Sequence, residues 1–229
     1  MTQAPTRRER LRNATLAEIK QAARQLVVEH GPTAISLRAI GRELGMSAPA
    51  LYRYFPSLDA LVIEVCTDLY EELREAIAAA ARTADTPPGQ LVAMARGFRS
   101  WSVAHPQEFA LLFGNPVPGV AQLEEGCEPD HPGARVGAVF LKPFAVVWHM
   151  LGHPTEVDDP ANAEQLAKAL AAHDEAVTPA CMYAFLGAWT RLYGMVALEV
   201  FGHLRWALTD VEPLFEAELD RFVRELTVR

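Results

Sequence analysis

The segment that decides the fold is residues 36–55, which read SLRAIGRELGMSAPALYRYF. Its first apolar residues recur at the spacing of one helix face, and Ser36 stands ahead of them where a helix cap is needed. Gly45 can adopt the left-handed conformation that ends a helix, and Pro49 suits the first turn of the next one. The segment therefore predicts two short helices joined by a tight turn, a helix–turn–helix.

The second of these helices has one side for the core and one for solvent. Leu51 is expected to anchor it to the core. The residues left free to face outward are Ala48, Ala50, Tyr52, Arg53 and Tyr54. In a helix–turn–helix, one helix braces against the phosphate backbone while the next enters the major groove of DNA. Small apolar side chains suit thymine methyl groups there, and Arg and Tyr suit phosphates or base edges.

Charge is distributed unevenly along the 229 residues, whose net charge is −8. Residues 1–60 hold nine Lys and Arg against five Asp and Glu, whereas the remainder holds 12 against 24. A basic head on an acidic body suits a protein that touches DNA at one end only. Arginines at positions 7, 8, 10 and 12 form a basic tail that either tracks phosphates or is merely a solvated arm.

Residues 13–62 resemble the N-terminal DNA-binding domain of TetR-family transcriptional regulators. The resemblance rests on a helix over 14–30 ending at Gly31, on the helix–turn–helix, and on the run LYRYFPS at 51–57 that leads into a long helix. The family usually has Lys after this Pro-Ser pair, where it bonds a DNA phosphate, but here the residue is Leu58. The C-terminal half is loosely similar to a subgroup with a Trp–His–Gly signature: Trp189 matches, and Tyr193 replaces the His.

The resemblance implies a set of DNA-contacting residues. Ser36 and the start of its helix would hold a phosphate, and Arg38 would contact a base, since arginine can bond guanine bidentately. The small residues of the second helix would lie against base edges, and the residues after it would contact phosphates or bases. The whole set is Ser36, Arg38, Ser47, Ala48, Pro49, Ala50, Tyr52, Arg53 and Tyr54.

The rest of the chain predicts an all-α protein. An apolar stripe over residues 58–82 indicates one long amphipathic helix that connects the head to the body. Further helices are expected at 91–105, 108–113, 134–151 and 161–173, with a loop at 114–133 and a kink at Pro143. We therefore expect a basic disordered arm at 1–12, a DNA-binding domain at 13–57 and a helical effector-binding and dimerisation domain at 58–229.

Two helices near the C-terminus are candidates for dimerisation. Residues 178–206 begin with a Thr-Pro start signal and are apolar on nearly all sides, and residues 211–226 carry a single apolar stripe. In the TetR-like architecture the last two helices pair with those of a second subunit in a four-helix bundle. The alternative is an internal hairpin of a monomer, which we consider less favoured because two-fold pairing gives a helix–turn–helix domain affinity for palindromes.

An effector pocket is expected among the middle helices, where aromatic and polar residues occur together. Bundle interiors commonly bind small molecules, although for any single one of these aromatics a place in the ordinary core is the more favoured alternative. The candidates are Phe98, Arg99, Trp101, Trp148, His149, Tyr183 and Trp189.

We expect neither a metal nor a cofactor. His149 and His153 have the i, i+4 spacing of paired ligands, but no nearby carboxylate or cysteine completes a site. Three scattered cysteines indicate a reducing compartment without disulfides. No apolar run is long enough for a membrane span or a secretory signal, so the protein is expected to be cytoplasmic.

These observations lead to one main interpretation and one alternative. The main one is an all-helical homodimer that binds a palindromic double-stranded DNA operator, represses transcription and responds to an unidentified small molecule. No phosphate loop, nucleophile motif or acid–base pair suggests an enzyme. The alternative is a helical small-molecule sensor or carrier with weak or no DNA binding, for which Leu58 offers slight support.

Overall fold

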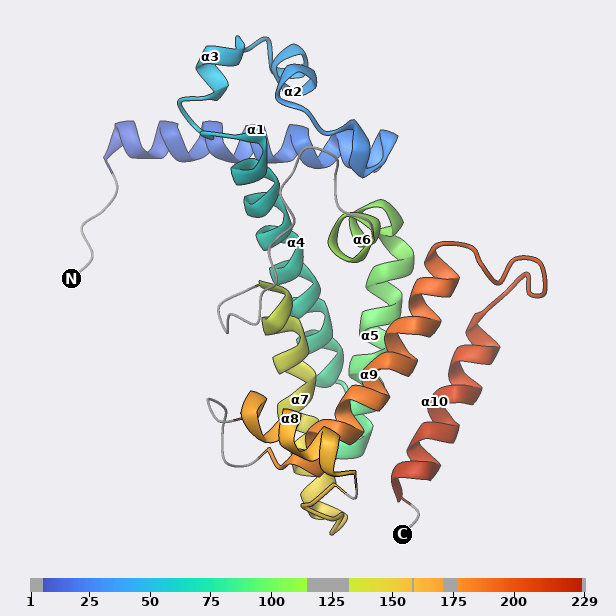
Figure 1. The fold of residues 1–229 in the computed structure, drawn as a ribbon. Coiled ribbons are helices and arrows are strands. Elements are labelled where there is room, and N and C mark those ends of the chain that lie inside the picture. Colours follow the sequence, from blue (N-terminus) through green and yellow to red (C-terminus); the bar gives the residue numbers. More distant parts are fainter. Residues whose placement is uncertain (1–5, 115–131, 158, 171–176, 228–229) are drawn as a thin grey trace. The chain divides into compact units, whose positions relative to one another are not determined.

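The computed structural model describes residues 6–114, 132–157, 159–170 and 177–227 (Figure 1). Every regular element in these ranges is a helix, which confirms the all-α prediction. The chain forms two units, the first made of residues 1–72 with 105–132, the second of 73–104 with 133–229.

The first unit contains the helix–turn–helix. It packs short helices against one long helix and against the first part of α4. Its elements are α1 (Arg7–His30), η1 (Pro32–Ala34), α2 (Leu37–Leu44), α3 (Ala48–Leu51), the start of α4 (Leu58–Ala81) and α6 (Pro106–Phe113). Its core is apolar, with Ile19, Val27, Ile40, Leu51 and Phe109 almost fully buried.

The arm predicted at residues 1–12 is wrong over its described part, because α1 begins at Arg7. Thr6 and Glu9 form a capping box: the Thr6 hydroxyl accepts the Glu9 backbone N–H, and the Glu9 carboxylate accepts the Thr6 backbone N–H at 2.7 Å. These hydrogen bonds lower the pKa of Glu9. A capped end satisfies backbone donors that would otherwise fray, so the arginines stand on a helix.

The predicted domain boundary between residues 57 and 58 also needs correction. The connecting helix predicted at 58–82 is α4, Leu58–Ala81, but the division between the units falls within it, after Glu72. Moreover, α6 belongs to the first unit although its sequence lies far beyond residue 57. The physical reason is packing: α6 lies against α1 and η1, and tertiary contacts rather than chain order define a compact unit.

The second unit is a bundle built around aromatic side chains. Its remaining helices are α5 (Pro87–Ala104), α7 (Pro132–Met150), α8 (Pro160–Leu170), α9 (Pro179–Val200) and α10 (Glu212–Thr227). The Phe98 ring lies 5.5 Å from that of Trp189 and 6.3 Å from that of Phe140, which joins α5, α7 and α9. The predicted loop at 114–133 and the end of the helix at 161–173 lie largely outside the described residues.

The helix predicted at 178–206 ends earlier, at Val200. Gly202 has φ of 71°, and two backbone bonds, Gly202 N–H to Glu199 O and His203 N–H to Leu198 O, close the end as a Schellman motif. Glycine adopts this conformation without the cost that a Cβ imposes, so it stops a helix whose apolar pattern runs on. No helix among the described residues is long and apolar enough to cross a membrane.

Candidate functional site

The helix–turn–helix has the geometry that its sequence predicts. The Ser36 hydroxyl accepts the Ala39 backbone N–H at 3.2 Å and so caps α2. Gly45 ends the helix with φ of 63°, and the following Met46 N–H donates to Gly41 O at 2.8 Å. Pro49 lies in the first turn of α3. These bonds fix the angle between α2 and α3 largely through the backbone.

Gly41 permits the close approach of the two helices. A Cβ built on Gly41 would lie 2.7 Å from Met46 O and 3.3 Å from Leu51 Cδ1. The backbone oxygen cannot move aside without opening the turn, so position 41 has room only for a hydrogen atom. Sequence reasoning missed this residue.

Replacing Gly41 with Ala is therefore expected to lower the free energy of unfolding by about 1–3 kcal/mol, the usual cost of overpacking. Urea denaturation followed by circular dichroism measures it. Gly137→Ala in α7 is the matched control, because nothing lies within 4 Å of its Cβ position and helix propensity favours Ala there. Equal stability of the Gly41 variant and the wild type would contradict the close approach.

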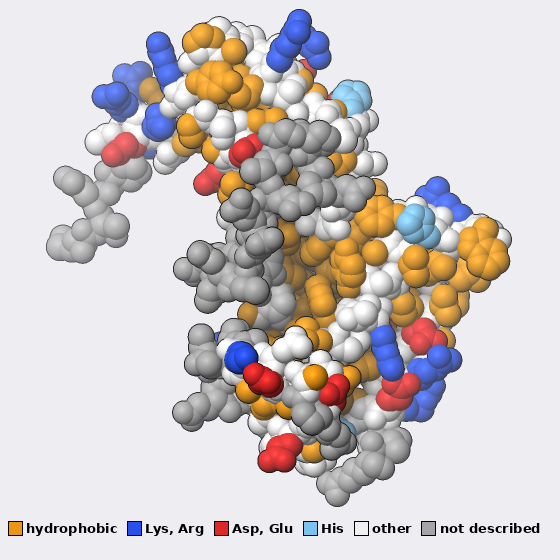
Figure 2. Space-filling model, in the orientation of Figure 1, with side chains coloured by type: hydrophobic (Ala, Val, Ile, Leu, Met, Phe, Trp, Pro, Cys, Tyr) orange, Lys and Arg blue, Asp and Glu red, His pale blue; other side chains and the backbone are white. Residues whose placement is uncertain are grey.

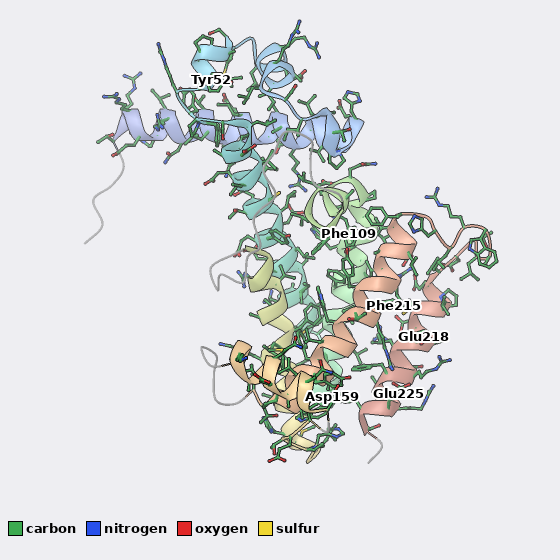
Figure 3. All side chains as sticks on the ribbon, in the orientation of Figure 1. Tyr52, Phe109, Asp159, Phe215, Glu218 and Glu225 are labelled. Atoms are coloured by element: carbon green, nitrogen blue, oxygen red, sulfur yellow. The ribbon has the colours of Figure 1, made fainter. Side chains whose placement is uncertain are left out.

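The predicted DNA-contacting residues lie together on α2, α3 and the turn after α3. Six are exposed and three are partly buried, namely Ser36, Ala50 and Tyr54. Tyr52, labelled in Figure 3, is 54% exposed although it is large and aromatic. Leu51 is fully buried beneath them, as predicted. The outward side of α3 is thus a surface of small groups bordered by Tyr and Arg.

Two local details differ from the sequence prediction. Ser occupies the cap position of α3 at residue 47, where its type predicts a hydroxyl cap, but the Ser47 side chain makes no capping bond. The α-helix itself is a single turn ending at Leu51, and i, i+3 bonds such as Tyr54 N–H to Leu51 O continue it. The exposed Ser47 hydroxyl therefore remains available for an outside partner.

A charge cluster joins three helices of the first unit. The Arg24 guanidinium donates to Glu72 at 2.7 Å and to Glu108 at 3.2 Å. Only 5% of the Glu108 side chain is exposed, whereas Glu72 is 39% exposed. Hydrogen bonding to Glu72 is the main reason that the pKa of Arg24 is raised. The cluster ties α1, α4 and α6 together.

The second unit contains an apolar cavity of about 100 Å³. Helices α5, α7, α9 and α10 supply its walls, and Phe215 and Glu218 of α10 can be located in Figure 3. Its main apolar lining residues are Leu91, Val92, Phe140, Phe144, Val147, Phe185, Trp189, Leu192, Met195, Phe215, Leu219 and Phe222. Such a cavity favours an apolar guest, because few of its walls can pair with charge.

The seven predicted pocket residues are not brought together around this cavity. Trp189 lines it, and Phe98 packs against Trp189 from the core side. Trp101 is buried, whereas His149 and Tyr183 are exposed. Sequence reasoning missed the other lining residues, because an apolar stripe looks the same whether it meets a void or a neighbouring helix.

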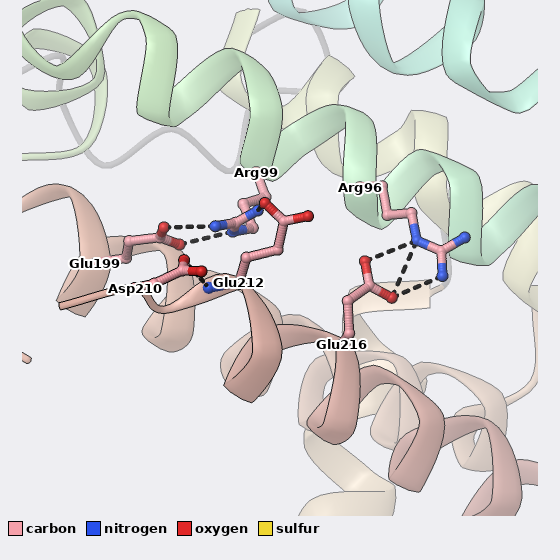
Figure 4. Close-up of polar contacts among 6 residues, drawn as sticks. All are labelled: Arg96, Arg99, Glu199, Asp210, Glu212 and Glu216. Atoms are coloured by element: carbon pink, nitrogen blue, oxygen red, sulfur yellow. Dashed lines mark hydrogen bonds and ion pairs between the residues drawn. The ribbon is translucent and has the colours of Figure 1, made fainter. Parts of the chain in front are cut away.

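Arg99, another predicted pocket residue, is held in ion pairs. Glu199 accepts its Nε and Nη2 hydrogens at 2.8 and 2.7 Å, and Glu212 lies 3.4 Å from Nη1 (Figure 4). The neighbouring Arg96 forms a similar pair with Glu216, which lowers the pKa of that carboxyl. Both arginines therefore bind α5 to α9 or α10 instead of presenting a charge to a ligand.

Trp148 and His153 have structural partners. The Trp148 indole N–H donates to Pro154 O at 3.0 Å. The indole ring stacks on the His153 ring, with 4.3 Å between the centroids. His153 Nε2 lies 2.7 Å from Leu226 O. Among the described residues, no three His, Cys, Asp or Glu side chains converge as a metal site would require.

Two of the three cysteines, Cys66 and Cys181, are buried and form no disulfide. Burial raises the pKa of Cys66 to about 12 and that of Cys181 to about 11, so both thiols stay protonated. A protonated, buried thiol is a poor nucleophile.

Comparison with known proteins covers both units. Residues 19–65 match the model described as bacterial regulatory proteins, tetR family, and residues 91–222 match the tetracyclin repressor-like C-terminal domain. An HTH-type transcriptional regulator of Mycobacterium tuberculosis is 33% identical over 215 residues, 88% of each chain. The crystal structure of the regulatory protein SCO4313 has a TM-score of 0.69 at 32% identity, covering 95% of this chain and 98% of that one. That of RolR in complex with resorcinol shares the fold, with a TM-score of 0.56 at 16% identity and 96% of each chain covered.

Proposed function

Because the chain belongs to the TetR family of transcriptional regulators, which are DNA-binding proteins and not enzymes, we propose that it is a repressor. It binds a palindromic operator as a homodimer and releases the operator when a small molecule enters its second unit. The observation that carries this proposal is the exposed surface of α2 and α3, whose orientation is fixed by Ser36, Gly41 and Gly45.

The proposed roles follow from what each side chain can bond. Ser47, Ala48, Pro49 and Ala50 lie against base edges, where small groups permit close approach and suit thymine methyls. Arg38 is the base contact from α2, through a bidentate bond to guanine. Ser36, Tyr52, Arg53 and Tyr54 contact phosphates or bases at the walls of the groove.

Leu58 makes one phosphate contact of the family weaker here. It is the first residue of α4, whose N-terminus is capped by the Ser57 hydroxyl accepting the Ala60 N–H at 3.1 Å. Unbonded N–H groups of the first turn attract an anion, but no side-chain cation at position 58 assists them. The protein therefore relies more heavily on its arginines for affinity to the DNA phosphate backbone.

The proposed dimer uses the predicted helices, now α9 and α10. One face of α9 exposes the large apolar side chains of Tyr183, Leu186 and Leu198, and Phe201, the residue after the helix, is also exposed. Orange side chains reach the surface along this helix in Figure 2. Gly187 lies on the same face with open space above its Cβ position. Most residues of the apolar stripe of α10 line the cavity, whereas Leu214 of the same helix is exposed. An unpartnered apolar face of this kind marks an interaction site.

The proposed effector is a small, uncharged molecule about the size of one aromatic ring. A dry cavity of about 150 Å³ lined by apolar side chains accepts benzene, and that of this chain is about 100 Å³. RolR, which shares the fold, is known in complex with the single-ring compound resorcinol. The effector would act through α4, the helix common to both units, and would shift the population away from the spacing that DNA requires.

Selection of bound sequences from random duplexes tests the proposed function. We expect an inverted repeat with half-sites about one helical turn, 34–36 Å, apart and two chains bound to each duplex. A single unrepeated half-site would contradict the dimer. Binding of no sequence at all would favour the alternative, a small-molecule carrier or sensor without DNA affinity. A protein of the proposed function works where the DNA is, so we expect it in the cytoplasm.

Filling the cavity is expected to abolish the response to an effector. Benzene at ten times its Kd should raise the stability of the wild type by about 1.4 kcal/mol, seen as a higher Tm. Leu192→Trp should remove this increase because the indole occupies the space. Val146→Trp, at an exposed position of α7, is the matched control and should keep it. An undiminished Tm increase in the Leu192 variant would place the ligand elsewhere.

A further inference from the structure

A basic surface lies next to α3 in the first unit. The first turns of α1 and the residues around α3 enclose an open groove of about 710 Å³. Four arginines line it, Arg7, Arg8 and Arg12 from α1 and Arg53 from the turn after α3, with Ala50 and Tyr54 between them. Lys and Arg side chains gather at this end of α1 in Figure 2.

No ion pair within the described part of the chain neutralises the positive charge of the groove. Among the described residues, no carboxylate pairs with Arg7, Arg8, Arg12 or Arg53. By contrast, Arg24, Arg96 and Arg99 each have a carboxylate partner. Glu9, the acidic residue of the first turn, is held by the backbone and hydroxyl of Thr6. Four guanidinium groups in one groove repel one another, so the arrangement favours an external anion.

The residues that line the groove are held in place by local contacts and do not belong to an unstructured arm. The capping box of Thr6 and Glu9 keeps the first turn of α1 helical. The Arg12 guanidinium lies over the Tyr54 ring, 5.5 Å from its centroid, and so links α1 to the turn after α3. Leu11 and Met46 add apolar lining, against which long arginine stems can rest.

We propose that this groove holds a stretch of the DNA sugar–phosphate backbone, so that the first two turns of α1 form a sequence-independent contact surface continuous with α3. The inference rests on the proposed function and adds a partner for a segment that the function did not use. A phosphodiester chain fits better than a single small anion, because the arginines are spread along a groove. Each guanidinium donates to phosphate oxygens, and each phosphate so neutralised releases a counterion.

The salt dependence of DNA binding tests this assignment. The full-length Arg7→Ala/Arg8→Ala variant is titrated with an operator duplex and with an unrelated duplex of the same length. We expect the slope of log Kd against log salt to fall in magnitude by about 0.9 for each phosphate that the variant no longer neutralises. The affinity should fall by the same factor on both duplexes, which leaves the preference for the operator unchanged.

Arg10→Ala is the matched control for a single Arg8→Ala change. Arg10 is exposed on the same turn of α1 but does not line the groove. We expect Arg8→Ala to reduce the slope and Arg10→Ala to leave it near the wild-type value, with equal helix content by circular dichroism. Alanine keeps the helix in both variants.

The outcomes separate this inference from the proposed function. If the wild type binds its operator and the double variant binds it with the same slope, the groove assignment fails and the function stands. Equal reductions of the slope in the Arg8 and Arg10 variants, or a weakening confined to the operator, would also overturn it. If the wild type binds no duplex at any salt concentration, both proposals fail together.

Discussion

The Arg53→Ala variant is expected to bind the operator about 5- to 150-fold more weakly than the wild type, a loss of about 1–3 kcal/mol. Arg53 is exposed at the end of α3, has no carboxylate partner among the described residues, and borders both the recognition surface and the basic groove. A guanidinium already free of internal pairs contributes its full bonding capacity to a base or phosphate. Gel-shift titration at fixed salt measures the effect.

The matched control for this prediction is Arg82→Ala. Arg82 is also exposed and carries the same charge, but it belongs to the second unit. Its removal should change the affinity only slightly, since charges beyond about 10 Å are screened at 0.1 M salt. An Arg53 variant with wild-type affinity would show that the turn after α3 does not touch DNA.

The Arg24→Met variant is expected to lose about 2–3 kcal/mol of stability. Arg24 donates to Glu108, whose side chain is 5% exposed, and without it that carboxylate is buried with its charge uncompensated. Methionine keeps most of the apolar stem, so the loss measures the ion pairs rather than packing. Urea denaturation measures the loss in the free energy of unfolding. Hydrogen exchange of the α6 backbone amides shows whether the loss is located at that helix.

Lys20→Met on the same helix is the control for Arg24→Met. Lys20 also forms ion pairs, with Glu64 and Asp68, but both carboxylates are more than half exposed. Pairs of that kind contribute about 0–1 kcal/mol. Adding Glu108→Leu to the Arg24 variant should restore most of the stability, because the buried charge is then removed. Equal effects of the Lys20 and Arg24 changes would contradict this account.

Prediction from sequence succeeded where the determining interactions are local. The cap at Ser36, the left-handed Gly45 and the first-turn Pro49 act within a few residues, so α2 and α3 could be predicted without the rest of the chain. The same local rules could have placed the start of α1, because Thr6 and Glu9 have the spacing of a capping box. These rules could also have predicted that α9 ends just before Gly202, which takes the left-handed conformation.

The sequence by itself determined the helix–turn–helix, the long connecting helix and the division into a basic head and an acidic body. Only the tertiary structure decided that α6 joins the first unit, that Arg24 meets Glu108, that a cavity opens beside Trp189, and that α1 and α3 enclose a basic groove. The physical reason is the separation along the chain of the residues that interact. Caps, turns and helix periodicity depend on neighbours in the chain, whereas a void, a buried ion pair or a shared groove depends on which distant helices pack together.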